Sequence, residues 1–326
     1  MTSTVPSAGP QTGSRSFLSR LKDGDEIARI ITLLFAASVV LITVLLVFQL
    51  WRGSVVARHK FGLAFLYTSF WDPNADQFGA WPFIYGTLLT SLVSLLIAVP
   101  LGIGAAIFLA ELAPQKVSDS LQFFIDLLAA VPSVIYGLLG IFIVVPLMRQ
   151  HIQPTLKTAF GALPLFGGTP FGVGYLTAGV VLAIMVIPYI ISVSREVLLA
   201  VPRDQREAAL ALGATRWEST WKVVVPFARS GIMGSIFLAL ARALGETMAV
   251  TMVIGNTPTV KASLFAPGYS IAAVIANEFS EATGEIYVQA LVFLGLVLFV
   301  LTFILNGLAR LLIVLTAQRG SGTGNA

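Results

Sequence analysis

The sequence predicts an all-α integral membrane protein with six transmembrane helices, and two observations support this prediction. Hydrophobic residues make up 56% of the 326-residue chain, whereas Asp, Glu, Lys and Arg make up only 11%. An average soluble domain has about 25% charged residues, so this chain has too little polar surface to cover a globule in water. Several long runs also lack all four charged residue types, and a helix needs about 20 apolar residues to cross a bilayer.

The apolar runs give the six spans in order. The first run, residues 30–51, is too long for the core of a signal peptide and is not followed by a small-residue cleavage site. Residues 230–256 are apolar apart from Arg242 and Glu246. The remaining charge-free runs are residues 77–110, 127–148, 158–194 and 286–309. The predicted spans are residues 28–50, 83–110, 121–147, 174–196, 230–255 and 287–315.

The distribution of Lys and Arg predicts the orientation of the chain. With the N-terminus in the cytoplasm, thirteen of the 20 Lys and Arg residues fall in cytoplasmic segments and six in outer segments. This bias follows the positive-inside rule, so we predict a multi-pass protein of the cell (inner or plasma) membrane with both termini cytoplasmic. Residues 1–26 and 318–326 are predicted to be disordered cytoplasmic tails because of their composition. They flank a membrane domain at residues 27–317.

The longest cytoplasmic loop, residues 197–229, carries the signals of two short helices. Asp204 is followed three residues later by Glu207, and Thr215 is followed in the same way by Glu218. This spacing is typical of capping boxes at helix N-termini. Gly213 lies between the two patterns, where a left-handed residue would end the first helix. Such a hairpin could enter a groove of another protein or rest on the membrane surface, and helix chemistry alone leaves both possibilities open.

The same loop resembles the EAA motif of ABC-importer permeases. Glu207-Ala208-Ala209 is followed after three residues by Gly213, and after nine more by Val223-x-Val225-Pro226. The two valines stand where the family has Ile and Leu. The resemblance implies that Glu207, Ala208, Ala209, Gly213 and Pro226 belong to a coupling hairpin that docks into an ATPase subunit. The residue pattern by itself predicts that Pro226 ends the second helix of this hairpin.

Two further segments resemble phosphate-importer permeases, most closely the PstC-type subunits. They are residues 126–137 and 241–249, within a resemblance that extends from about residue 27 to 315. It implies a type I ABC-importer permease fold. It also implies four kinds of partner: a homologous second permease (PstA-type), two copies of an ATP-binding subunit, an extracytoplasmic phosphate-binding protein and membrane lipid, but no nucleic acid.

The chain itself is predicted to be a transporter subunit and not an enzyme. No Gly-Lys-Ser or Gly-Lys-Thr triplet occurs, so a Walker A loop is absent from the sequence. ATP and Mg are therefore expected on the partner ATPase, with no cofactor on this chain. We expect no metal site, because there is no cysteine and because His59 and His151 lie in outer loops without a paired ligand.

Arg242 and Glu246 are the candidate residues of the substrate path. Arg242 is predicted to lie ~18 Å along the fifth span, near the bilayer centre. A charge there is costly and marks a functional site by default. In a continuous helix Glu246 would lie one turn further on the same face. The pair could form a structural bridge that locks helices together, or Arg242 could line the path of an anion whose binding Glu246 moderates.

Three other functions compete with phosphate import. A permease for sulfate or molybdate would carry the same motifs, because composition does not separate tetrahedral oxyanions. A proton-coupled secondary carrier would use Glu246 and Asp126 as proton relays, but it has no use for the cytoplasmic EAA loop. An intramembrane hydrolase ranks last, because no span contains a paired-aspartate, Ser–His or His-Glu-x-x-His arrangement.

Overall fold

The structure is a computed structural model that describes residues 25–321, with side chains described from residue 26 to 311. The predicted tails, residues 1–26 and 318–326, lie outside the described residues except at their inner ends. The chain divides into two compact units, residues 1–52 and 53–326. Six helices in the described part are long and apolar enough to cross a membrane, which confirms the predicted number.

The first unit contributes one helix, α2 (Asp25–Gly53), whose last residue belongs to the second unit. Its side chains are almost all exposed, including Leu33, Leu34 and Phe35. A long helix that is apolar on all its faces is the form expected for a membrane span.

The second unit contains the other five spans and the segments that connect them. Its first half comprises α3 (Val55–Phe61), β1 (Trp71–Asp72), β2 (Gln77–Phe78), α4 (Trp81–Ile107), α5 (Gln115–Ala129), α6 (Ser133–Leu139), α7 (Val145–Leu147) and α8 (Gln153–Phe160). Its second half comprises α9 (Tyr175–Leu199), α10 (Arg203–Ala211), α11 (Arg216–Ser219), α12 (Val225–Leu244), α13 (Met248–Ile254), α14 (Ile271–Glu278) and α15 (Glu285–Ser321).

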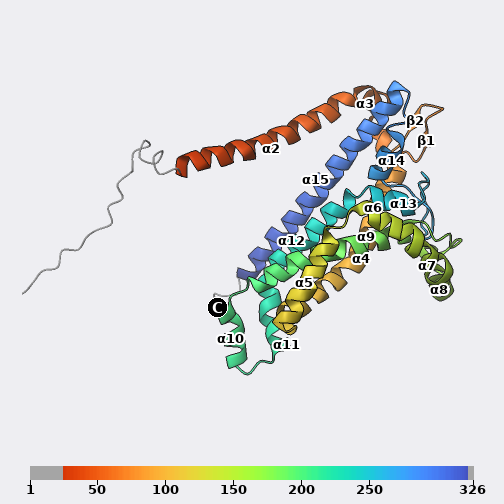
Figure 1. Ribbon diagram of the computed structural model, residues 1–326. Helices are drawn as coiled ribbons and strands as arrows, with labels where there is room; N and C mark the ends of the chain where they lie inside the picture. Colours follow the sequence, from red (N-terminus) through yellow and green to blue (C-terminus); the bar gives the residue numbers. More distant parts are fainter. Residues whose placement is uncertain (1–24, 322–326) are drawn as a thin grey trace, which may run out of the picture. The chain divides into compact units, whose positions relative to one another are not determined.

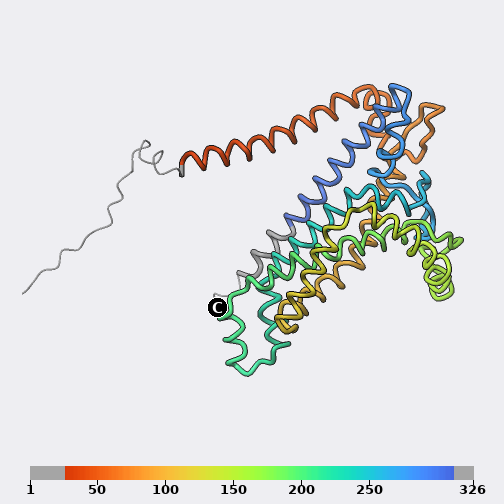
Figure 2. The backbone as a smooth tube through the Cα atoms, in the orientation of Figure 1, coloured from red at the N-terminus to blue at the C-terminus, as the bar shows by residue number. Residues whose placement is uncertain are grey.

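Helix α9 is the centre of the packing in this unit. It runs beside α4 (Figures 1 and 2) and also contacts α12, α13 and α5. Ala178, Leu182, Val186 and Ile190 form a fully buried row at four-residue spacing along α9. Small residues allow close approach: a Cβ at Gly102 of α4 would lie 2.7 Å from Cγ2 of Ile190. The α4–α9 pair is therefore packed in the manner of membrane helices that meet through small residues.

The third span does not lie where the charge-free run predicted it. The chain stops being helical at residues 130–132, between α5 and α6, and the apolar span runs from Ser133 to Phe160. Pro132 has no N–H to donate, and its ring disfavours helical geometry at Val131. The predicted helix 121–147 is therefore two helices.

The fifth span is also interrupted where a continuous helix at residues 230–255 was predicted. Helix α12 ends at Leu244, and α13 begins at Met248. Gly245 follows the last helical residue, and a glycine costs about 1 kcal/mol relative to alanine inside a helix. Oε1 of Glu246 accepts the N–H of Ala249 at 3.2 Å, which satisfies one of the free amides at the new helix start.

Three prolines of the membrane domain follow π-helical turns. The turns Gly140–Val144, Met148–Ile152 and Thr220–Val224 end two residues before Pro146, Pro154 and Pro226, respectively. The wider π turn suits a residue that cannot donate an N–H and whose ring collides with the carbonyl four residues earlier. The prediction that Pro226 ends the second helix of the hairpin is therefore wrong, because the helix continues from Arg216 to Leu244.

The two ends of the second unit differ in construction. Figure 1 shows the α10–α11 hairpin at one end, and α3, the β1–β2 ribbon and α14 at the other. At the ribbon end, Oε2 of Glu278 accepts hydrogen bonds from Nε1 of Trp71 at 2.9 Å and from the hydroxyl of Tyr287 at 2.7 Å. Burial is the main cause that raises the pKa of nearby Tyr269 to about 12.

Candidate functional site

Arg242 lies in the last turn of α12, with its side chain partly buried. Its guanidinium carbon lies 4.2 Å from the centre of the Tyr189 ring of α9. This cation–π contact holds the charge in an apolar setting. Nε of Arg242 is buried and has no hydrogen-bond partner among the described residues. A buried donor without an acceptor is uncommon in a native protein and calls for an explanation.

Glu246 does not pair with Arg242. Among the described residues, neither side chain takes part in a salt bridge. The expected one-turn spacing is wrong because the helix ends at Leu244, and Glu246 instead binds the N–H of Ala249. A structural bridge between the two residues therefore has no geometric basis here, and the charge of Arg242 has no carboxylate partner in the described chain.

Two tyrosines join the Arg242 region to the interruption after α5. The hydroxyl of Tyr189 donates to the carbonyl of Ala129 at 3.2 Å, and the hydroxyl of Tyr136 donates to that of Leu128 at 2.7 Å. These carbonyls belong to the C-terminal turn of α5, where partners four residues further on are lacking, and that of Leu128 also accepts the N–H of Val131 at 3.1 Å. Sequence reasoning missed Tyr189, although a phenol beside Pro188 in a charge-free run was a signal that a polar group needs a partner there.

The segments that follow the two interruptions contact each other. Helix α6 packs against α13, and a Cβ at Gly137 would lie 2.3 Å from Sδ of Met252. The broken third and fifth spans thus meet through their short helices. Broken helices at membrane depth are tolerated where they are buried in protein or line a cavity.

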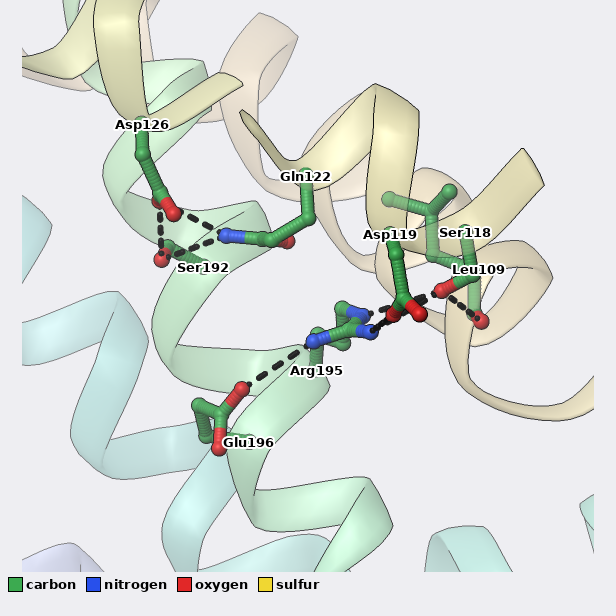
Figure 3. A network of polar contacts seen from close by, with 8 residues as sticks. All are labelled: Leu109, Ser118, Asp119, Gln122, Asp126, Ser192, Arg195 and Glu196. Carbon is green, nitrogen blue, oxygen red and sulfur yellow. Dashed lines mark hydrogen bonds and ion pairs between the residues drawn. The ribbon is translucent and has the colours of Figure 1, made fainter. Parts of the chain in front are cut away.

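A polar seam connects α5 to α9 (Figure 3). It consists of Ser118, Asp119, Gln122 and Asp126 from α5, and Ser192, Arg195 and Glu196 from α9. Asp126 accepts hydrogen bonds from Nε2 of Gln122 at 2.7 Å and from Oγ of Ser192 at 2.9 Å. The Asp126 carboxylate is therefore held by neighbouring donors from both helices.

The coupling hairpin, α10 and α11 with the turn between them, has one of its two predicted capping boxes. The N–H of Glu218 donates to Oγ1 of Thr215 at 3.2 Å, and the N–H of Thr215 donates to Oε2 of Glu218 at 3.0 Å. The predicted box at Asp204 is wrong. Pro202 precedes the first helical residue, so Asp204 falls inside the first turn and makes no capping hydrogen bond.

The turn of the coupling hairpin is closed by Gly213, as predicted. Its φ is +87°, a left-handed value that favours glycine. The N–H of Gly213 donates to the Leu210 carbonyl at 3.0 Å, and the N–H of Ala214 donates to that of Ala209 at 3.1 Å. This pair of bonds is a Schellman motif. Leu212, at the tip of the hairpin, is 90% exposed.

The predicted coupling residues divide between two places. Glu207, Ala208 and Gly213 are exposed on the hairpin, while Ala209 is buried beneath it. Pro226 lies beyond the π turn, in the first turn of α12. The structure therefore brings the EAA residues together but separates Pro226 from them.

The chain matches proteins of known family over most of its length. Residues 98–313 match the family of the binding-protein-dependent transport system inner membrane component. The phosphate transport system permease protein PstC of Pasteurella multocida is 49% identical over 287 residues, covering 87% of this chain and 89% of that protein. The PstC of Mesorhizobium japonicum is 47% identical over 285 residues, covering 85% and 87%. The predicted resemblance to PstC-type permeases is confirmed.

Two solved structures show the same fold at low sequence identity. One is a bacterial alginate ABC transporter in complex with an alginate-bound periplasmic protein, with a TM-score of 0.56, 16% identity, and coverage of 89% of this chain and 96% of that chain. The other is the inward-facing MetNI methionine ABC transporter, with a TM-score of 0.53, 17% identity, and coverage of 72% and 96%. They confirm the ABC-importer permease fold. This chain belongs to the family of binding-protein-dependent transport system inner membrane components.

Proposed function

We propose that this chain is one permease subunit of an ATP-driven importer of inorganic phosphate. The observation that supports this proposal most strongly is Arg242, a partly buried cation whose Nε has no acceptor within the described chain. An oxyanion would supply the missing acceptor. The relatives that are 47% and 49% identical are named as phosphate transport system permeases, which favours phosphate over sulfate or molybdate.

The guanidinium of Arg242 suits this role because its planar N–H donors match two oxygens of a tetrahedral anion. The ring of Tyr189 supports one face of the group and leaves the N–H donors at its edge free to bind. Glu246 lies two residues past the end of α12. We infer that its carboxylate lies near the path and weakens the hold on the anion, so that phosphate binds and leaves.

The assembly that we propose contains a homologous second permease, two ATP-binding subunits and an external phosphate-binding protein. The exposed coupling hairpin, with Leu212 at its tip, is the surface that docks into the ATP-binding subunit. ATP and Mg are bound there and not by this chain. Closure of the ATPase pair moves the hairpin and opens the path alternately to each side of the membrane.

The substrate is tested by uptake in cells. We expect cells that lack this chain to lose high-affinity uptake of labelled phosphate and to regain it when the chain is restored. Unlabelled phosphate and arsenate should compete with the label, because both are tetrahedral anions that carry hydroxyl protons near neutral pH. Competition by sulfate or molybdate, without competition by arsenate, would assign the path to a different oxyanion.

The proposed orientation is tested by reporter fusions. A reporter after Ser219 should be cytoplasmic, and a reporter at Gly168 should lie outside, because the Lys and Arg residues concentrate on the side of the hairpin. The measurement is alkaline phosphatase activity against fluorescent-protein emission at each site. The opposite pattern at both positions would invert the proposed topology.

Tyr189 offers a separate test of the anion path. We expect Tyr189→Leu to raise the KM for phosphate uptake by about 5- to 10-fold, since a cation–π contact contributes about 1 kcal/mol. Tyr189→Phe keeps the ring under Arg242 and removes only the hydrogen bond to Ala129, so its KM should stay close to that of the wild type. Equal KM values for Leu and wild type would show that the ring does not position Arg242.

A further inference from the structure

Arg206 is a residue of the coupling hairpin that turns inward. It precedes Glu207, the first residue of the EAA motif, but its side chain is only 20% exposed, and that of its partner Glu111 only 10%. Glu111 lies in the π turn Phe108–Leu112, which continues α4 to the end of its span. The two residues are 95 positions apart in sequence.

The contacts of Arg206 use most of its donors. Nε donates to both carboxylate oxygens of Glu111 at 3.2 Å, and Nη2 donates to Oε1 at 2.8 Å, so the pair is held by a two-pronged contact. Nη2 also donates to the carbonyl of Leu198 at 2.7 Å, and Nη1 donates to that of Val201. Leu198 is in the last turn of α9 and Val201 follows the helix. The Leu198 carbonyl also accepts the N–H of Val201 at 3.3 Å, and a cation at a helix C-terminus interacts favourably with the terminal carbonyls.

One guanidinium therefore ties α10 to the ends of both α4 and α9. These two helices are packed closely through Gly102 and Gly179, where a Cβ would lie 2.7 Å from Ile190 and 2.4 Å from Val93. Helix α9 also carries Tyr189, on which Arg242 stacks. The helix that presents the EAA residues is thus bound to the helix pair that supports the candidate anion path.

We propose that the Arg206–Glu111 pair is the joint through which movement of the coupling hairpin reaches α4 and α9. This proposal rests on the proposed function, because it requires an ATPase that moves the hairpin. Arg206 is a positioning residue: its donors are occupied by Glu111 and by backbone carbonyls, so it acts through α4 and α9. Loss of the joint leaves a hairpin that still docks but no longer moves the path with each cycle of ATP hydrolysis.

The test compares transport with ATP consumption in the assembled complex. The complex with its ATP-binding subunits is reconstituted in proteoliposomes, and phosphate taken up per ATP hydrolysed is measured. We expect Arg206→Gln and Glu111→Gln each to lower this ratio about fivefold or more, while the amount of co-purified ATPase and the rate of hydrolysis stay within about twofold of wild type. Because both changes break one joint, the double variant should be no worse than either single variant.

One conservative variant and one control variant make the comparison more specific. Arg206→Lys keeps the charge but not the two-pronged geometry, so its ratio should fall between those of wild type and Arg206→Gln. Lys116→Gln removes a positive charge from an exposed position in the first turn of α5, outside the coupling hairpin, and should leave the ratio unchanged.

The outcomes are distinct. An unchanged ratio of phosphate to ATP in both Arg206→Gln and Glu111→Gln would overturn the proposal that this pair transmits movement. Loss of the ATPase from both complexes would also overturn it, because it would show that the pair serves only to fold the hairpin. A wild-type complex that hydrolyses ATP but accumulates no phosphate would contradict the proposed function instead.

Discussion

Replacing Arg242 with Gln is expected to lower phosphate uptake by about 100-fold or more while the complex still assembles. Each charge-assisted hydrogen bond contributes about 1.5–3 kcal/mol, and the guanidinium can make two to a phosphate. Gln keeps a polar side chain of moderate size but carries no charge. Uptake of labelled phosphate and the abundance of the protein in isolated membranes should be measured for the same cells. Loss of the protein from the membrane would assign Arg242 a structural role.

A conservative variant of Arg242 and a variant of the neighbouring Glu246 provide matched controls for this prediction. Arg242→Lys should be partly active, because a point charge lacks the planar pair of donors. Glu246→Gln keeps an acceptor oxygen for the Ala249 N–H and removes only the charge, so phosphate should bind more tightly and leave more slowly. Its KM and maximal uptake should both fall. Recovery of transport in the double variant Arg242→Gln, Glu246→Gln would contradict an anion path through Arg242.

Gly213→Asp is expected to lower the amount of ATPase that co-purifies with this chain by about tenfold, which corresponds to about 1.4 kcal/mol. Gly213 has a left-handed φ of +87°, and nothing lies within 4 Å of an added Cβ. The new side chain therefore faces away from the rest of the chain and toward the proposed docking partner. The measurement is the ratio of ATPase to permease in complexes purified through a tag on this chain.

Gly213→Asn is the matched control because Asn has nearly the same shape as Asp and tolerates left-handed backbone geometry better than most residues. We expect Asn to retain most of the ATPase and Asp to lose it, since only Asp adds charge to the docking surface. Equal ATPase content in wild type, Asn and Asp complexes would show that the turn does not contact the ATPase.

The number of spans could be predicted from the sequence because membrane insertion depends on local composition. A run of about 20 apolar residues is long enough to cross the bilayer, and this does not depend on how the rest of the chain folds. The turn at Gly213 and the capping box at Thr215 were predictable for a similar reason, since each depends on hydrogen bonds within a few residues.

The interruptions in the third and fifth spans were not predictable in the same way. Pro100 and Pro188 lie inside continuous helices, Pro146 and Pro226 follow π turns, and Pro132 lies in the non-helical gap between α5 and α6. The residue type is the same in each case, so the surrounding packing decides the outcome. At Pro132 the hydroxyls of Tyr136 and Tyr189 satisfy the freed carbonyls of α5, and no sequence pattern places those tyrosines there.

The candidate site was predictable in its charged residues but not in their partners. Arg242 was identified because an arginine inside an apolar run is costly, whereas its contact with Tyr189 joins residues 53 positions apart. The pairing of Arg206 with Glu111 is a contact of the same kind, made across 95 positions. Such contacts depend on the fold of the whole membrane domain, so the local sequence can signal that a polar group needs a partner but cannot identify that partner.

The most direct test of an ATP-driven phosphate path is accumulation of labelled phosphate in proteoliposomes that contain this chain with its permease and ATPase partners. The phosphate-binding protein is added outside the proteoliposomes, and Mg and ATP are enclosed inside, on the side of the ATPase. We predict that phosphate accumulates inside, that this accumulation requires ATP hydrolysis, and that it persists in the presence of a protonophore. Phosphate accumulation that continues without ATP and collapses with the protonophore would contradict the ATP-driven mechanism and indicate a proton-coupled carrier.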